Sequence, residues 1–290
     1  MSVSIDDSRV FPQVRHMPAA VIPAPSAAAA AKVLASFARR LVHAGAGLLL
    51  PALVLALWWT AAEHRWVPEQ LLPAPTLVWQ SLHELWASGD LQSHLAFSTS
   101  RVAWSLGLGV AAGSLLGIGM GLSRTLRAYL HPSFDVAAQF PVLGWIPLLI
   151  IFVGIDEALK ILAISIAVVV PVTLNVLKGI DNVPAAWLEV ARVYRFNTLQ
   201  VLTKVVLPAA APSLFTGLRQ AVMQAWLSLV FVELLASSEG IGYLIVWGRQ
   251  LSQPDLVVAG MVVIGAVGVL LDTALRFAES RLQGWRRTAF

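Results

Sequence analysis

The sequence predicts an all-α membrane protein with six transmembrane helices, and three observations support this prediction. Hydrophobic residues make up 58% of the 290 residues and charged residues only 12%, a balance outside the range of soluble globular domains. Apolar runs of roughly 20 residues, the length that crosses a bilayer core of about 30 Å, recur along the chain. Short basic segments separate these runs, as cytoplasmic loops of membrane proteins do.

The first 43 residues contain no span. Residues 1–31 are weakly apolar and broken by prolines, which is typical of a disordered tail. Residues 32–43, "KVLASFARRLVH", place apolar side chains on one helical face and basic ones elsewhere, which is typical of a helix lying on membrane lipid. We therefore expect a disordered basic cytoplasmic tail with an interfacial helix over 1–43 and a membrane domain over 44–290.

The first span is predicted over residues 45–62. A secretory signal peptide is the alternative, because Thr60 and Ala62 are small enough for a cleavage site. The preceding tail is far longer than the usual charged segment of a signal peptide. We therefore expect an uncleaved anchor.

The second span, residues 102–122, follows a polar segment in which two short amphipathic surface helices, "TLVWQSLHELWASG" and "DLQSHLAFSTS", are expected. This span has glycine at every fourth position, so the glycines share one helix face and allow a neighbouring backbone to approach closely. The glycines of this predicted packing face are Gly109, Gly113, Gly117 and Gly121.

The remaining spans are predicted over residues 134–154, 158–177, 213–236 and 256–277. Pro141 and Pro147 should kink the third span, because each proline removes a backbone donor and crowds the preceding turn. Between the fifth and sixth spans, the amphipathic segment "SSEGIGYLIVWGRQLSQPD" predicts a short re-entrant or surface helix.

The distribution of basic residues predicts the orientation. The tail, the loops after the second and fourth spans and the C-terminus hold most of the lysines and arginines, so both termini are expected in the cytoplasm. The opposite side receives only Arg65, Arg101, Lys160 and Arg249.

A cytoplasmic loop of residues 179–208 has the pattern of two helices joined by a turn. Pro184 is suited to an early helical position, and a helix is expected up to "RFN". A second helix should begin near Thr198 and end at Pro208. A solvated connector between two spans is the alternative reading of such a loop.

The spacing within this loop resembles the EAA loop of permease subunits in binding-protein-dependent ABC importers. That motif reads Glu-Ala-Ala, three residues, Gly, nine residues, Ile, one residue, Leu-Pro. Here the matching positions are Glu189, Val190, Ala191, Arg195, Val205, Leu207 and Pro208. Arginine at the glycine position implies a turn built differently, with Asn197 supplying the bend.

The resemblance extends over residues 72–287, to permeases of the aliphatic sulfonate, nitrate and taurine group. It implies a type I ABC importer permease fold in a bacterial cytoplasmic (inner) membrane. The implied partners are a second copy of the permease, two ABC ATPase subunits, an extracytoplasmic substrate-binding protein and membrane lipid. The loop residues expected to couple to the ATPase are Trp187, Leu188, Glu189, Ala191, Arg195, Leu207 and Pro208.

The sequence predicts neither an enzyme nor a cofactor site. It has no G-x-x-x-x-G-K-[ST] phosphate-binding loop, so ATP hydrolysis is expected in a partner subunit. It has no cysteine, which excludes thiolate chemistry. Nucleic-acid binding is not expected despite the net charge of +4, because the basic residues lie in short segments between spans.

Polar groups inside the spans are the candidates for a transport pathway. Buried polar groups are costly in a bilayer and are functional hypotheses by default. They are Gln139, Trp145, Thr173, Asn175, Gln220, Gln224 and Glu233. For Glu233 a structural interhelical hydrogen bond is the alternative, and Arg219 is expected to extend toward the membrane surface. An ATP-independent secondary transporter or channel is the alternative function, although no internal repeat or mid-membrane charge favours it.

Overall fold

The computed structural model describes residue 47 and residues 49–282. The contacts divide the chain into two units, residues 1–58 and residues 59–290, and the bundle described below belongs to the second. The tail and interfacial helix expected over residues 1–43 lie outside the described residues. An apolar helix, Leu49–Glu63, covers the described part of the predicted first span.

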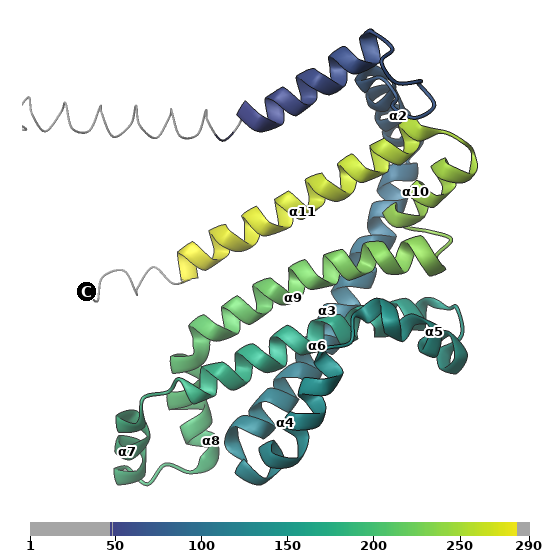
Figure 1. The fold of residues 1–290 in the computed structure, drawn as a ribbon. Coiled ribbons are helices and arrows are strands. Elements are labelled where there is room, and N and C mark those ends of the chain that lie inside the picture. The colour runs from purple at the N-terminus through teal and green to yellow at the C-terminus, as the bar shows by residue number, and fades with distance from the viewer. Residues whose placement is uncertain (1–46, 48, 283–290) are drawn as a thin grey trace, which may run out of the picture. The chain divides into compact units, whose positions relative to one another are not determined.

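The described residues form helices and connecting turns, without a strand (Figure 1). The labelled helices are α2 (Pro75–Ser88), α3 (Asp90–Leu122), α4 (Arg124–Ala138), α5 (Val142–Val153), α6 (Glu157–Asp181), α7 (Ala185–Val193), α8 (Thr198–Val201), the π-helix η1 (Leu202–Val206), α9 (Leu207–Ala236), α10 (Ile241–Gln250) and α11 (Pro254–Leu282). The predicted all-α membrane class is confirmed, and α10 is the short helix expected between the fifth and sixth spans.

The predicted count of six spans is not exactly confirmed in the part of the chain that the structure describes. Four helical segments in the described residues are long and apolar enough to cross a membrane, or five if the bent pair α4 and α5 counts as one span. The four segments are Asp90–Leu122, Glu157–Asp181, Thr198–Gln250 and Pro254–Arg281. The helix Leu49–Glu63 is shorter than these.

The separate surface helix expected at "DLQSHLAFSTS" is wrong, because these residues are the first third of α3. The chain bends before them, at Gly89, whose φ of +87° is accessible to glycine. The amphipathic pattern suggested a surface location, but Ser98 and the following Arg101 are both buried at helix contacts.

The third predicted span is not one kinked helix but two helices, α4 and α5, that meet at 100°. Pro141 explains the break. It has an extended backbone (φ −63°, ψ 144°) directly before α5, and proline also disfavours helical backbone in the residue that precedes it. Pro147 lies inside α5 without ending it.

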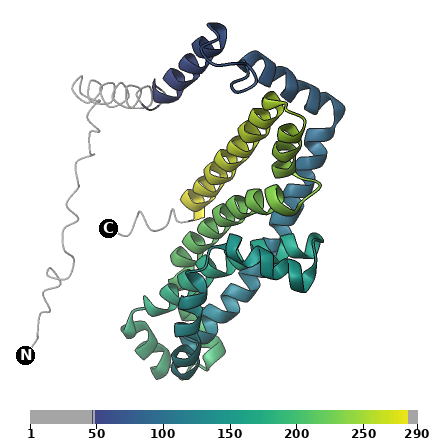
Figure 2. The ribbon, with the colours of Figure 1, turned by 45° about the vertical axis from the view of Figure 1, so that its right-hand side comes forward.

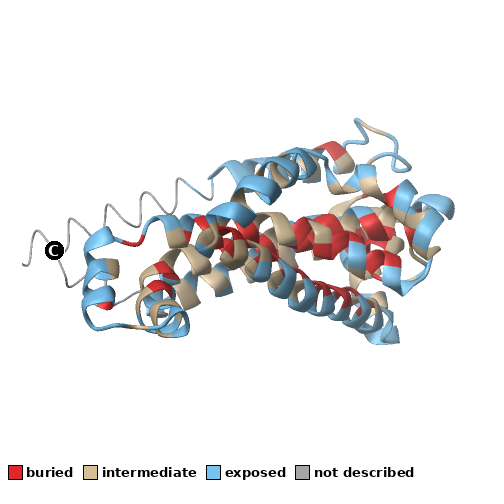
Figure 3. Ribbon diagram, turned by 90° about the horizontal axis from the view of Figure 1, so that it is seen from below, coloured by how far each residue is buried: buried red, intermediate tan, exposed pale blue. Residues whose placement is uncertain are grey.

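Helix α6 forms the centre of the bundle and packs most extensively against α3 and α9. Its buried positions continue into the facing sides of these two helices, so the buried residues gather along the middle of the bundle (Figure 3). The four glycines at every fourth position of α3 lie on its contact with α6. A Cβ atom at Gly113 would lie 2.9 Å from the carbonyl oxygen of Val169 and from Cβ of Val172. The two backbones are therefore close enough to leave no room for side chains.

Candidate functional site

The loop expected between the fourth and fifth spans forms a helical hairpin made of α7, α8 and η1. Figures 1 and 2 show this hairpin at one end of the bundle and α10 at the other. Helix α6 connects the two ends, and its 25 residues span roughly 37 Å at about 1.5 Å per residue. The hairpin thus lies at one end of the bundle, where the chain enters it from α6 and leaves it into α9.

Arginine at the motif's glycine position led us to expect a turn of a different kind. The structure contradicts this expectation. Arg195 itself has the left-handed conformation, with φ of +53°. The Phe196 amide donates to the carbonyl of Ala191 at 3.0 Å, and the Arg195 amide donates to that of Arg192 at 2.9 Å. This hydrogen-bond pattern is the Schellman motif, which usually has glycine at the left-handed position.

Asn197 does not supply the bend but begins the second half of the hairpin. Its side chain accepts a hydrogen bond from the Gln200 amide at 2.8 Å, and the Gln200 side chain accepts one from the Asn197 amide at 2.9 Å. This reciprocal pair is a capping box, which satisfies amides that have no partner within the helix.

Pro208 does not end the second helix, as was expected. The π-helical turn η1 precedes it, and the chain continues directly into α9. The Leu207 amide bonds to the carbonyl of Leu202, five residues earlier. The wider turn changes the bonding pattern next to a residue without an amide hydrogen, so the helix passes through the proline.

The exposed face of the hairpin includes most of the predicted coupling residues. Glu189, Arg195 and Pro208 are exposed, Trp187 is 52% exposed and Leu207 is 38% exposed. Leu188 is half-buried. Ala191 is buried, so the surface contact expected of it is absent and its carbonyl instead closes the turn. Other exposed apolar residues of the hairpin are Val190, Val193, Tyr194 and Leu199.

An ion pair fixes the base of the hairpin to α4. Arg127 donates two hydrogen bonds of 2.8 Å, one to each carboxylate oxygen of Asp181, the last residue of α6. This two-point geometry restricts orientation as well as distance. Both side chains are about two-fifths exposed, so the pair adds little to the free energy of unfolding.

A cavity of about 800 Å³ lies where the break between α4 and α5 faces α6 and α9. Four of the seven predicted pathway residues line it: Gln139, Asn175, Gln220 and Gln224. The Asn175 amide donates to Gln220 Oε1 and to the Pro171 carbonyl, each at 2.8 Å. The cavity therefore presents neutral amide groups beside an apolar wall.

The other three predicted pathway residues lie elsewhere. Thr173 is fully buried between α6 and α3 and donates to the Gly113 carbonyl at 3.2 Å. Trp145 is on α5 and packs edge-on against Phe140, which lines the cavity. Glu233 belongs to a polar network at the end of α6 that lies opposite the hairpin.

A charged pair on the cavity wall was not predicted from the sequence. Arg219 of α9 and Asp272 of α11 both line it, and their ion pair measures 2.7 Å. Arg219 is thus paired within the bundle. The signal that could have found the pair is the presence of one cation and one anion inside two apolar spans.

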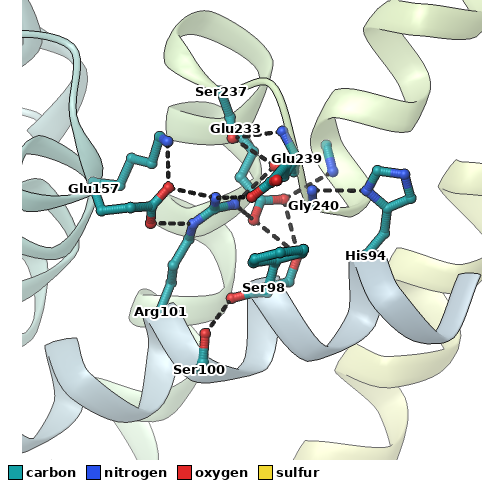
Figure 4. A network of polar contacts seen from close by, with 12 residues as sticks. His94, Ser98, Ser100, Arg101, Glu157, Glu233, Ser237, Glu239 and Gly240 are labelled. Atoms are coloured by element: carbon teal, nitrogen blue, oxygen red, sulfur yellow. Dashed lines mark hydrogen bonds and ion pairs between the residues drawn. The ribbon is translucent and has the colours of Figure 1, made fainter. Parts of the chain in front are cut away.

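At the end of the bundle opposite the hairpin, Arg101 is the centre of a buried network (Figure 4). Its guanidinium donates to both Glu157 oxygens at 2.8 and 2.7 Å, to Glu233 at 2.8 Å and to the Glu239 carbonyl at 2.8 Å. Arg101 is 2% exposed and Glu233 1%. Glu233 thus makes the interhelical hydrogen bonds that were the alternative to a pathway role, and the buried position of Arg101 was not predicted.

The network attaches the start of α10 to α3. Glu233 accepts from Ser98 and from the Gly242 amide at 2.9 Å, and the Ser98 hydroxyl in turn accepts from the Ile241 amide at 3.0 Å. Gly240, with φ of +105°, lies so close to Glu233 that a Cβ atom would overlap the carboxylate. The buried charges are fully paired, the condition under which burial is tolerated.

The described residues contain no group of three or more His, Asp or Glu side chains arranged to hold a metal ion.

A family model described as "binding-protein-dependent transport system inner membrane component" matches residues 109–284.

Two relatives cover most of the chain. The aliphatic sulfonates transport permease protein SsuC of Bacillus subtilis (strain 168) is 40% identical over 242 residues, 83% of this chain and 88% of that protein. The taurine transport system permease protein TauC of Escherichia coli (strain K12) is 34% identical over 239 residues, 81% of this chain and 87% of that protein.

A crystal structure of an amino acid ABC transporter with histidines shares the fold. Its TM-score is 0.59 at 14% identity, with 69% of this chain and 97% of that chain covered. The family model covers more than half of the present chain, and both relatives exceed 30% identity. The chain therefore belongs to the binding-protein-dependent transport system inner membrane components, as a multi-pass ABC importer permease subunit with the type I permease fold.

Proposed function

We propose that the chain forms the translocation pathway of an ATP-driven importer of small sulfonates or taurine and couples to ATPase subunits through residues 179–208. The observation that carries the proposal is the hairpin. Its spacing matches the EAA motif, its turn has the left-handed residue at the motif's glycine position, and Glu189 is exposed on α7.

In this proposal the hairpin lies in the cytoplasm, as do both termini, and the protein crosses a bacterial inner membrane. The excess of lysine and arginine on the hairpin side supports this orientation. The Arg101 network then lies toward the extracytoplasmic side, where a substrate-binding protein would deliver substrate. Two permease copies and two ATPase subunits would complete the importer.

The hairpin is suited to transmit movement because η1 is continuous with α9, and only three residues separate α7 from α6. Glu189 would pair with a basic or backbone donor group of the ATPase, and Trp187 and Leu188 would supply apolar contact. Closure of two ATPase subunits would draw two hairpins together. Helix α9 continues from η1 without a break, so the movement would reach the cavity wall and alternate its access.

The names of the two relatives support sulfonates and taurine as substrates. The group that the sequence resembles also includes nitrate permeases, so nitrate-like anions are the second substrate class. The amide-lined cavity can donate hydrogen bonds to anionic oxygens of either class.

Growth of a strain lacking the gene tests the proposal. Wild-type protein should restore growth on ethanesulfonate or taurine as the sole sulfur source. Glu189→Lys should abolish it at normal membrane expression, because the charge reversal opposes docking. Glu84→Lys, the same change at an exposed site on α2, is the control and should grow as wild type.

Two outcomes contradict the proposal. Normal growth of the Glu189→Lys strain would remove the docking role of the hairpin. Sulfonate uptake that persists after deletion of the ATPase gene would favour the alternative, an ATP-independent transporter. Growth restored on nitrate as sole nitrogen source, and not on sulfonates, would transfer the chain to the second substrate class.

A further inference from the structure

We propose that Arg219 binds the anionic group of the substrate in the cavity, and that Asp272 occupies Arg219 when substrate is absent. The inference rests on the proposed import of sulfonates and names the residues that recognise them. Among the residues that line the cavity, Arg219 is the cation and Asp272 the anion.

The hydrogen bonds of Arg219 leave capacity for a ligand. Its Nε and Nη2 both donate to one oxygen of Asp272, at 3.2 and 2.7 Å, and Nη1 donates to Glu279 at 3.3 Å. A guanidinium has five N–H donors in a planar fork, and here three are used. None of these contacts is the parallel two-oxygen pair that a guanidinium prefers. A sulfonate, with three equivalent oxygens, can form that pair.

Asp272 has a second partner that can hold it after release. Its other oxygen accepts from Arg276 Nε at 2.7 Å, one turn later on α11. When a substrate anion replaces Asp272 at Arg219, Asp272 remains paired with Arg276. Arg219 likewise passes from one anion to another, so neither charge is left uncompensated during the exchange, which limits its cost in an apolar bundle.

The cavity wall around Arg219 supplies neutral donors. Gln220 and Gln224 lie one turn apart on α9, and Asn175 faces them from α6. Their amide groups can bond to the remaining sulfonate oxygen or to a polar tail without adding charge. Met223 and Leu174, also on the wall, can contact a short alkyl chain. A small alkanesulfonate therefore matches the lining chemically.

Exchange at Arg219 predicts opposite effects of two substitutions on anion binding. The probe is radiolabelled ethanesulfonate, bound by the detergent-purified permease–ATPase complex without the binding protein. Arg219→Gln should weaken binding about tenfold or more, because a charge-assisted pair is lost. Asp272→Asn should tighten binding several-fold, because the competing carboxylate is removed. Neutral ethanesulfonamide should bind weakly to every variant.

A merely structural ion pair predicts a different result, since both substitutions would then weaken binding alike. Any of three outcomes would overturn the inference. They are equal weakening by both substitutions, unchanged binding in Arg219→Gln, and no ethanesulfonate binding by a wild-type protein that does import it. Arg219→Lys and Glu279→Gln provide second variants should the first pair fold poorly. Glu279→Gln should tighten binding less than Asp272→Asn, because Glu279 makes the longer contact.

The failure of the inference is distinguishable from failure of the proposed function. ATP-driven uptake of ethanesulfonate by wild type, in proteoliposomes with the ATPase and binding protein, is measured in parallel. Absence of wild-type uptake contradicts the proposed function. Wild-type uptake combined with equal losses in both variants contradicts only the assignment of Arg219.

Discussion

At the scale of single residues, Arg195 shows what a motif position demands. The hairpin turn needs a left-handed backbone there, and Arg195 adopts it at φ of +53° although an L side chain makes this costly. The hydrogen bonds of Phe196 and Arg195 to α7 and the capping box at Asn197 hold the turn in place. The arginine therefore changes the stability of the hairpin and leaves its geometry intact.

Replacement of Arg195 by glycine should stabilise the turn by about 1 kcal/mol, because glycine has no Cβ penalty in this conformation. Hydrogen exchange of the Phe196 amide should then slow about fivefold, since that amide is bonded across the turn. Arg192→Gly is the matched control: Arg192 lies inside α7, where glycine costs up to about 1 kcal/mol and exchange should accelerate. Slower exchange in both variants would contradict this explanation.

At the scale of elements, the contact between α3 and α6 depends on residues without side chains. A Cβ atom added at Gly109, Gly113 or Gly117 would lie within about 3 Å of α6 atoms, and these atoms include backbone carbonyl oxygens. Backbone cannot move aside as a flexible side chain can, so the close approach fixes the spacing of the two helices. Thr173 adds a hydrogen bond across the same contact.

Gly113→Ala should destabilise the purified permease by about 1–3 kcal/mol, because the added methyl group meets Val169 and Val172 in a packed contact. Gly107→Ala, on the same helix with open space around it, should leave the midpoint of thermal unfolding unchanged or slightly raised. Equal midpoints for the two variants would show that the glycines do not set the packing of α3 on α6.

Helices whose position depends on their own apolar composition were predicted well from the sequence. Helix ends and breaks that depend on contacts with distant residues were predicted less well. The apolar cores of α3, α6, α9 and α11 were identified because their composition alone favours a bilayer. The start of α3 was missed because Ser98 and Arg101 are polar residues that are buried by partners distant in sequence. The break at Pro141 was underestimated, since proline predicts a disturbance without giving its angle.

The candidate sites show the same difference between features set by a local sequence pattern and features set by distant residues. The spacing of the hairpin motif is local, so its turn could be located from sequence, although the left-handed Arg195 could not. Four pathway residues line the cavity: Asn175 on α6, Gln220 and Gln224 on α9, and Gln139 at the end of α4. The pairing of Arg219 with Asp272 joins residues 53 positions apart, and no local pattern predicts it.

At the scale of the whole bundle, three features lie in order along α6. The hairpin lies at its Asp181 end, the cavity is lined by its middle, and the Arg101 network lies at its Glu157 end. The glycine contact with α3 and the buried network pack this part of the molecule closely. Movement applied at the hairpin would therefore reach the cavity through packed helices rather than be lost in flexible loops.

Thiol crosslinking at the hairpin tests the central claim, docking of an ATPase subunit, most directly. The chain contains no cysteine, so Val190→Cys places a single thiol on the exposed face of α7. In membranes that carry the complete transporter, a bifunctional maleimide–amine reagent should link this thiol to the ATPase subunit. Trp79→Cys, at a position on α2 that is more exposed than Val190, should give no such product. Absence of the Val190→Cys product, or equal yields at both positions, would contradict the account.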